Sequence, residues 1–182
     1  MRELSLNVLD IAQNSISAGA SLITLSVDEN TADNRLTLTI ADNGRGMTPE
    51  QLEQVRDPFY TTRTTRKVGM GIPLFRMAAE MAGGDLNIQS QVGVGTTVTA
   101  KFELRHIDRM PLGDINGTVS TLIRLNPNLD FVYRYHTKSG EYELDTRELR
   151  QVLDGVPLSE PDVMAWIDAH MAEGLLPLDP QA

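Results

Sequence analysis

The chain of 182 residues contains no cysteine. A disulfide framework, a thiolate zinc site and a cysteine nucleophile are therefore excluded. The sequence also lacks any apolar run approaching the length that spans a bilayer. Its first residues lack the apolar segment and the small-residue cleavage site of a secretory signal. We therefore expect a cytoplasmic protein with no membrane span.

Basic residues are scarce relative to acidic ones. The 16 Lys and Arg residues stand against 25 Asp and Glu residues, which gives a formal net charge of -9. Because a duplex-binding surface needs clustered cations to neutralise phosphates, this balance disfavours direct nucleic-acid binding. Two familiar nucleotide-binding motifs are absent as well: Gly-x-x-x-x-Gly-Lys-Ser/Thr and a strand-linked Gly-x-Gly-x-x-Gly. The usual nucleotide-binding folds are therefore poor fits.

The first hundred residues alternate between helical and strand-like patterns. Apolar residues recur at helical spacing in some segments and at every second position in others. Thr48 is a suitable N-cap for a short helix that has Pro49 at its first position. The predicted order is a helix at 3–18, strands at 22–27 and 35–40 joined by a turn at 28–34, a short helix from 49, a loop at 57–67, a helix at 72–81, and strands at 86–90 and 96–102.

The pattern restarts after about His106. We expect a helix at 117–125, a hairpin of 131–135 with 141–144, helices at 146–153 and 159–172, and a frayed tail at the end. None of the three histidines lies in a recognisable motif. The predicted organisation is a first unit at 1–105 and a small α+β unit of unknown role at 106–182.

Four short polar and glycine-rich signals follow one another in the first unit. They are Asp10-x-x-x-Asn14, Asp42-x-Gly44-x-Gly46, Gly69-x-Gly71 and Gly93-x-Gly95-Thr96-Thr97. Each signal alone has an ordinary interpretation, such as an exposed helical residue or a plain turn. Their fixed order is far more specific than any one of them.

This ordered set resembles the N, G1, G2 and G3 boxes of the histidine-kinase/gyrase/Hsp90/MutL-like ATPases (the GHKL or Bergerat-fold superfamily), over about residues 4–104. Residues 57–62, Asp-Pro-Phe-Tyr-Thr-Thr, are similar to the F box of histidine kinases. Residues 13–20 are closer to MutL-type and other ATPase members, whereas 58–62 and 69–74 are closer to histidine kinases. As a whole, the chain most resembles the ATP-binding domain of histidine kinases and anti-sigma-type kinases. The resemblance implies an α+β fold: a two-layer sandwich whose mixed, mostly antiparallel sheet is covered on one face by helices.

The resemblance also implies that the chain binds ATP and Mg²⁺. Asn14 would supply a neutral oxygen ligand to Mg²⁺, and Asp42 would accept a hydrogen bond from the adenine amino group. Thr96 or Thr97 would approach the adenine edge beside Asp42. Glycines would let the backbone pass beneath the base and present N–H groups to the phosphates at a helix start. The other expected nucleotide-binding residues are Gly44, Gly46, Met47, Phe59, Thr62, Arg63, Lys67, Val68, Gly69, Met70, Gly71 and Ile72.

The sequence leaves two roles open. Arg63, Arg66 and Lys67 could cover the phosphates as a lid, or they could be solvated cations of a polar loop. Asp10 occupies the position where ATPase members carry a catalytic Glu and histidine kinases commonly carry Asn. It could act as the general base, or it could serve as a second Mg²⁺ contact or a solvated side chain.

Three functions fit this pattern. The preferred one is a signalling protein that phosphorylates or sequesters a protein partner, such as a response regulator or a sigma-type factor. We expect no phosphoacceptor-histidine hairpin, because only a few residues precede the first helix. The second is an ATPase switch resembling MutL or gyrase, with Asp10 as base. The third is a non-catalytic nucleotide-binding module.

Overall fold

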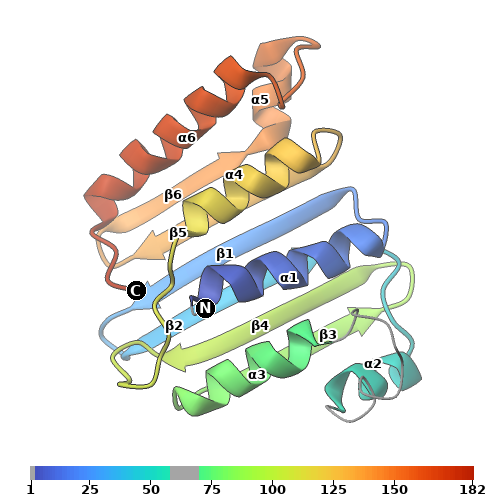
Figure 1. The fold of residues 1–182 in the computed structure, drawn as a ribbon, viewed down its shortest axis with the longest axis vertical. Coiled ribbons are helices and arrows are strands. Elements are labelled where there is room, and N and C mark those ends of the chain that lie inside the picture. Colours follow the sequence, from blue (N-terminus) through green and yellow to red (C-terminus); the bar gives the residue numbers. More distant parts are fainter. Residues whose placement is uncertain (1–2, 58–69) are drawn as a thin grey trace.

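The computed structural model describes residues 3–57 and 70–182 (Figure 1). Within these residues, six strands form one mixed sheet in the order β3-β4-β2-β1-β5-β6, and helices α1, α3, α4 and α6 lie on one of its faces. The predicted α+β sandwich is therefore confirmed. The elements are α1 (Leu4–Ser17), β1 (Leu22–Asn30), β2 (Arg35–Asp42), α2 (Pro49–Arg56), α3 (Gly71–Met81), β3 (Asp85–Gln91), β4 (Gly95–Glu103), α4 (Ile115–Leu125), β5 (Asp130–Thr137), β6 (Gly140–Asp145), α5 (Thr146–Leu153), α6 (Pro161–Leu175) and the 3₁₀ turn η2 (Leu176–Leu178).

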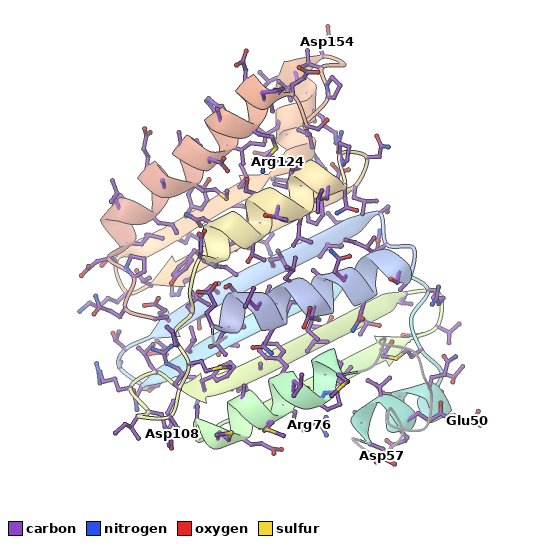
Figure 2. The ribbon with its side chains drawn as sticks, in the orientation of Figure 1. Glu50, Asp57, Arg76, Asp108, Arg124 and Asp154 are labelled. Carbon is purple, nitrogen blue, oxygen red and sulfur yellow. The ribbon has the colours of Figure 1, made fainter. Side chains whose placement is uncertain are left out.

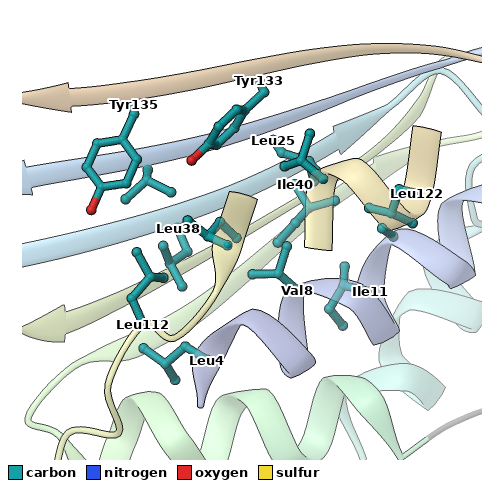
Figure 3. Packing of buried hydrophobic residues seen from close by; sticks show 14 of the residues in the cluster. Leu4, Val8, Ile11, Leu25, Leu38, Ile40, Leu112, Leu122, Tyr133 and Tyr135 are labelled. Atoms are coloured by element: carbon teal, nitrogen blue, oxygen red, sulfur yellow. The ribbon is translucent and has the colours of Figure 1, made fainter. Parts of the chain in front are cut away.

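Helix α1 packs its apolar face on the middle of the sheet. Leu4, Val8 and Ile11 of this helix are buried and lie over inward-facing side chains of β1 and β2 such as Leu25 and Leu38 (Figure 3). Burying each Leu or Ile side chain contributes roughly 1.5–3 kcal/mol, so this contact fixes the rotation of the helix on the sheet. The polar side of α1 is consequently turned away from the sheet.

Strands β1 and β2 are longer than the sequence pattern predicts. Asp28 and Asn30 continue the antiparallel ladder opposite Thr37 and Arg35, so the turn is confined to 31–34. The predicted turn at 28–34 was therefore wrong at its first residues. Asp28 and Asn30 are compatible with a strand here because they point to the sheet face opposite the helices, where alternate residues are partly exposed.

The residues after 106 extend the same sheet. Strand β5 pairs with β1 in parallel, from Leu22 opposite Asp130 to Asp28 opposite His136. The chain reaches this parallel position through α4, as a crossover connection requires. Buried apolar residues from both predicted units form one continuous core. The division into 1–105 and 106–182 stays a prediction, which an unfolding experiment can test.

A buried carboxylate joins β1 to the last residues of the chain. Glu29 is only 1% exposed and accepts hydrogen bonds from the Tyr135 hydroxyl and from the backbone N–H groups of Gln181 (2.8 Å) and Ala182 (3.1 Å). Burial lowers the pKa of the nearby Arg109, while the Glu29 carboxylate acts in the opposite direction. The tail is therefore held against the sheet, and the expected fraying was wrong.

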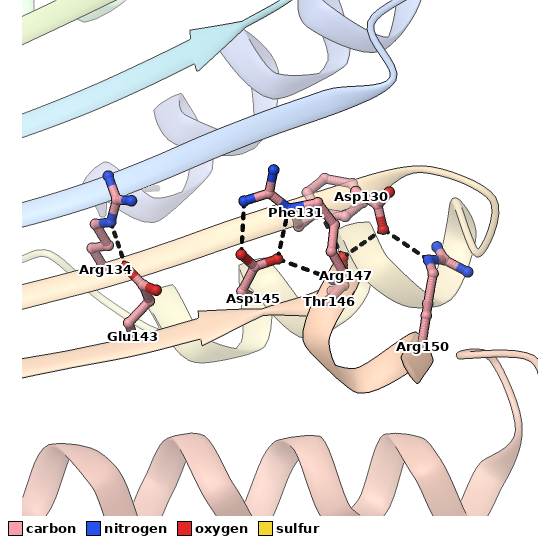
Figure 4. Close-up of polar contacts among 8 residues, drawn as sticks. All are labelled: Asp130, Phe131, Arg134, Glu143, Asp145, Thr146, Arg147 and Arg150. Carbon is pink, nitrogen blue, oxygen red and sulfur yellow. Dashed lines mark hydrogen bonds and ion pairs between the residues drawn. The ribbon is translucent and has the colours of Figure 1, made fainter. Parts of the chain in front are cut away.

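Charged side chains of the C-terminal part pair with one another (Figure 4). Arg150 donates to Asp130 at 2.7 Å and to the carbonyls of Pro127 and Leu129, which clamps the turn before β5. Arg147 donates to Asp145 at 2.7 Å, and this bond lowers the pKa of the Asp145 carboxyl.

None of the helices in residues 3–57 and 70–182 is long and apolar enough to cross a lipid bilayer.

Candidate functional site

A cavity of about 360 Å³ lies where α1, α2 and the edge of the sheet meet. Its size suits a small organic ligand. Apolar side chains from five elements and polar groups from α1, β2, α2 and β4 line it together. The lining residues are Ile11, Asn14, Ser15, Ser17, Ala18, Asp42, Arg45, Gly46, Met47, Gln51, Gln54, Val55, Ile72, Ile88, Thr96 and Val98.

Asp42 forms the polar floor of this cavity. The Ser15 hydroxyl donates to its Oδ2 at 2.6 Å, and the N–H groups of Gly44 (2.9 Å) and Thr96 (3.3 Å) donate to its Oδ1. An ionised carboxylate only accepts hydrogen bonds, and each oxygen can accept about two. Oδ2 has one donor within the described residues, so it can accept a further hydrogen bond from a ligand.

Two glycines bring the backbone segments around Asp42 into direct contact. Gly46 has a φ of +70°, and a Cβ atom there would lie 2.0 Å from the Gln91 carbonyl oxygen. Gly95 has a φ of +140°, and a Cβ atom there would lie 1.9 Å from the Asp42 carbonyl oxygen. Only glycine combines these angles with so close an approach. The two turns therefore bring Asp42 and Thr96 side by side, as their strand register also requires.

Helix α2 forms a wall of the cavity and is anchored at both ends. The Thr48 hydroxyl accepts from the N–H of Gln51 (3.1 Å), whose side chain accepts from the N–H of Thr48 (3.0 Å), so the predicted N-cap is confirmed as a capping box. At its other end Arg56 donates to the Ile88 carbonyl at 3.1 Å. Arg76 of α3, labelled in Figure 2, donates to the Arg56 carbonyl at 3.4 Å.

Two polar side chains of α1 beside the cavity have no partner within the described residues. Asp10 and Asn14 are one turn apart on α1 and are exposed, and neither side chain forms a hydrogen bond or ion pair with the residues that the structure describes. Helix α3 begins against them: a Cβ atom at Gly71 would lie 3.5 Å from Cβ of Asp10 and 4.0 Å from Nδ2 of Asn14. The start of α3 has no side-chain cap, so its first N–H groups favour an anion.

The structure places the predicted site residues in three groups. Six of them line the cavity: Asn14, Asp42, Gly46, Met47, Ile72 and Thr96. A second group does not line the cavity. Asp10, Gly44, Met70 and Gly71 flank it, and Thr97 lies on the other face of β4, where it pairs with Ala41 and Gln89. The remaining predicted residues, Phe59, Thr62, Arg63, Arg66, Lys67, Val68 and Gly69, lie outside the described residues.

Sequence reasoning missed Ser15 and most of the apolar wall. Ser15 is 3% exposed, although it directly follows the exposed Asn14 on α1. A serine on the apolar face of an amphipathic helix was a usable signal, because a buried hydroxyl needs a partner. Ile88 and Val98 had no such signal, since they alternate with exposed or partly exposed residues like the other buried apolar residues of β3 and β4.

Comparisons with known proteins agree with this geometry. Residues 1–106 match the family described as histidine kinase-, DNA gyrase B-, and HSP90-like ATPase. The chain is also 37% identical over 107 residues to the sensor protein SrrB of Staphylococcus aureus, in strains NCTC 8325 / PS 47, COL and MRSA252. The matched segment is 56% of this chain but only 18% of each relative. The chain thus covers less than a fifth of the length of these proteins.

Proposed function

Because the chain belongs to the histidine kinase-, DNA gyrase B- and HSP90-like ATPase family, we propose that its ATP-binding, histidine-kinase-like part uses Mg-ATP to phosphorylate or sequester a protein partner. Response regulators and sigma-type factors are the partner classes that the sequence resemblance favours. One observation carries the proposal. Asp42 is held rigidly in the floor of a ligand-sized cavity with Oδ2 able to accept another hydrogen bond.

The base of ATP would occupy the floor of the cavity. Its amino group would donate to Oδ2 of Asp42, and its ring faces would contact apolar side chains such as Ile88 and Val98. A carboxylate cannot donate a hydrogen bond, so a purine with a keto oxygen at this position would leave two acceptors facing each other. This arrangement therefore favours adenine over guanine.

The phosphates would extend toward the mouth, where the residues present fit Mg²⁺. Asn14 offers an amide oxygen and Asp10 a carboxylate, and neither has a partner within the described residues. Such oxygen ligands suit a hard cation that also bridges phosphates. When bound, Mg²⁺ would neutralise phosphate charge. The start of α3 would bind phosphate oxygens through its N–H groups. Arg63, Arg66 and Lys67, with Phe59, Thr62, Val68 and Gly69, complete the proposed site by resemblance.

A second candidate function is an ATPase switch. It is favoured by the carboxylate of Asp10, which lies one turn from Asn14 and beside the start of α3 without any partner in the described part of the chain. A carboxylate in this position could accept a proton from an attacking water. In the kinase or sequestering function, Asp10 would serve only as a contact to the metal or to solvent.

The test measures ATP binding by calorimetry and phosphate release by the isolated chain with Mg²⁺. We expect Asn14→Ala to weaken ATP binding at least about tenfold, or roughly 1.4 kcal/mol, because it removes a metal ligand. Asn87→Ala, on the exposed part of β3, should change nothing and serves as the matched control. Asp10→Asn should retain binding.

Phosphate release separates the two functions. Release that is lost in Asp10→Asn would favour the ATPase switch with Asp10 as base. Binding without release would favour transfer to, or sequestration of, a partner. A native chain that does not bind ATP at all would refute the proposed function.

A further inference from the structure

Ser90 of β3 connects two walls of the nucleotide cavity from behind. Its hydroxyl accepts a hydrogen bond from the Met47 N–H at 2.8 Å and lies 2.8 Å from the Thr96 hydroxyl. It can also donate to the Gly95 carbonyl at 3.2 Å. Met47 and Thr96 line the cavity, whereas Ser90 does not. Ser90 therefore cannot be found by looking for ligand contacts.

The single proton of Ser90 determines what Thr96 can offer to a ligand. If Ser90 donates to Thr96, the proton of Thr96 is available to the cavity, and Thr96 acts as a donor. If Ser90 donates to the Gly95 carbonyl, Thr96 must donate to Ser90 and has only lone pairs left for a ligand. The 2.8 Å distance to Thr96 fits either direction, and the first arrangement is the one that a base with an acceptor beside its amino group requires.

This polarity matters because Thr96 stands next to Asp42. The two residues are opposite each other in the strand register, and the Thr96 N–H donates to the Asp42 carboxylate at 3.3 Å. Adenine presents a donor, its amino group, next to an acceptor, the ring nitrogen N1. A carboxylate beside a donating hydroxyl, acting directly or through one water, complements that pair.

We propose that Ser90 is a positioning residue that determines base specificity: it orients the Thr96 hydroxyl as a donor toward the base and ties the turn containing Met47 to β3. The inference rests on the proposed binding of ATP by this cavity. It assigns a role to a residue that makes no contact with the nucleotide.

A double-mutant cycle on the full chain tests this role, with ATP and inosine triphosphate as titrants in the presence of Mg²⁺. Inosine carries a keto oxygen in place of the amino group and an N–H in place of the N1 acceptor. Ser90→Ala should weaken ATP binding about tenfold and lower the preference for ATP over inosine triphosphate, because the Thr96 hydroxyl becomes free to turn. Ser90→Thr, which keeps the hydroxyl, should restore both.

The cycle separates positioning from plain structural support. In a Thr96→Val background, Ser90→Ala should cause a smaller loss of ATP affinity than in the native chain and no change in the preference for ATP, because only the bond to the Met47 N–H is then lost. If Ser90 only satisfies the Met47 N–H, the same loss will appear in both backgrounds and the preference for ATP will not change, which overturns the inference. Ser26→Ala, which removes a hydroxyl from the opposite face of β1, is the matched control.

Two further outcomes have fixed meanings. If Ser90→Ala does not fold, Ser90→Cys keeps the size of the side chain with a weaker hydrogen-bonding group, and it should shift the ATP preference in the same direction. An unchanged preference in Ser90→Cys would contradict the inference. Failure of the native chain to bind ATP would instead refute the proposed function.

Discussion

The two parts of the molecule use their polar groups in opposite ways. In residues 4–104, Asp10 and Asn14 have no partner within the described residues, and Asp42 can accept one more hydrogen bond. In residues 106–182, Asp130 and Asp145 are each bonded to an arginine of α5 (Figure 4). Both parts belong to one sheet. At the cavity the fold leaves polar atoms able to bind a ligand, whereas these two carboxylates of the C-terminal part are already bonded.

Charge follows the same division. Residues 106–182 contain thirteen Asp and Glu and only six Lys and Arg, so most of the net charge of -9 lies there. The part with the cavity is nearly balanced. An anionic nucleotide is therefore repelled less at the cavity than at the C-terminal part.

The largest expected effect separates the site from the scaffold. Asp42→Asn replaces one carboxylate oxygen, an acceptor, with an N–H₂ group, a donor. At the Oδ2 position this group would face Ser15 and the base, and at the Oδ1 position it would face the N–H groups of Gly44 and Thr96. ATP affinity should fall at least about 100-fold, or roughly 2.7 kcal/mol, and the rise in melting temperature caused by ATP should disappear. Calorimetry and thermal unfolding with and without ATP measure both. Asp28→Asn, on the opposite sheet face, should keep the rise; a retained rise in Asp42→Asn would refute the role of Asp42.

Glu29→Gln should have the converse effect. The Glu29 carboxylate accepts from the Tyr135 hydroxyl and from two backbone N–H groups, using both oxygens. The amide has only one oxygen, so its N–H₂ group would face at least one of these donors. The free energy of unfolding should fall by about 2–3 kcal/mol while the rise in melting temperature caused by ATP is retained. Urea unfolding measures the loss, and the exposed Glu141→Gln is the control.

The same urea curves examine the boundary between the two parts. A shared core and sheet should give one transition for the native chain and for Glu29→Gln. Two transitions would instead favour separate units at 1–105 and 106–182. A Glu29→Gln protein that is fully stable but has lost ATP binding would contradict the division of roles described above.

The smallest effect for a single side chain is a dependence on alkaline pH that arises in the C-terminal part. Burial raises the pKa of Tyr142 to about 12, and it also raises the pKa of Tyr133 and Tyr135. Because the folded state holds these protons more tightly, its stability is fully present below about pH 10 and is lost as pH rises toward the folded pKa. Above pH 10, each tyrosine that stays protonated lowers stability by up to about 1.4 kcal/mol per pH unit.

Urea unfolding at pH 8, 10 and 11 measures this slope. Tyr133→Phe should flatten it, although the variant also loses the hydroxyl bond to Asn116 at 2.9 Å and therefore starts from lower stability. An equal free energy of unfolding at pH 8 and pH 11 would show that these tyrosines are not held protonated by the fold.

Much of the ATP-binding part could be predicted because its signals are local. The apolar spacing of α1, the capping residues of α2 and the glycines of the tight turns each act within a few positions of the chain. Family membership followed from the order of the motifs, and the match over residues 1–106 confirms it. The predicted roles of Asp10, Asn14 and Thr96 remain predictions, since each depends on a bound nucleotide.

Other features could not be predicted from local patterns. Ser90 shares the face of β3 that carries Leu86 and Ile88, and only the approach of Met47 and Thr96 makes it a connection. Glu29 resembles part of a polar turn, yet it is buried because Tyr135 and Gln181 bond to it from positions 106 and 152 residues away. Sequence spacing carries no signal for such distant partners.

The order of helices and strands, the turns that require glycine and the family of the chain follow from the amino acids alone, because each rests on interactions between near neighbours or on a linear order of motifs. Tertiary structure decided that β5 lies parallel to β1, that Glu29 holds the end of the chain, and which threonine of β4 faces the cavity. Those outcomes depend on which surfaces bury the most apolar area and satisfy the most buried hydrogen bonds, and that balance is set only when the whole sheet assembles.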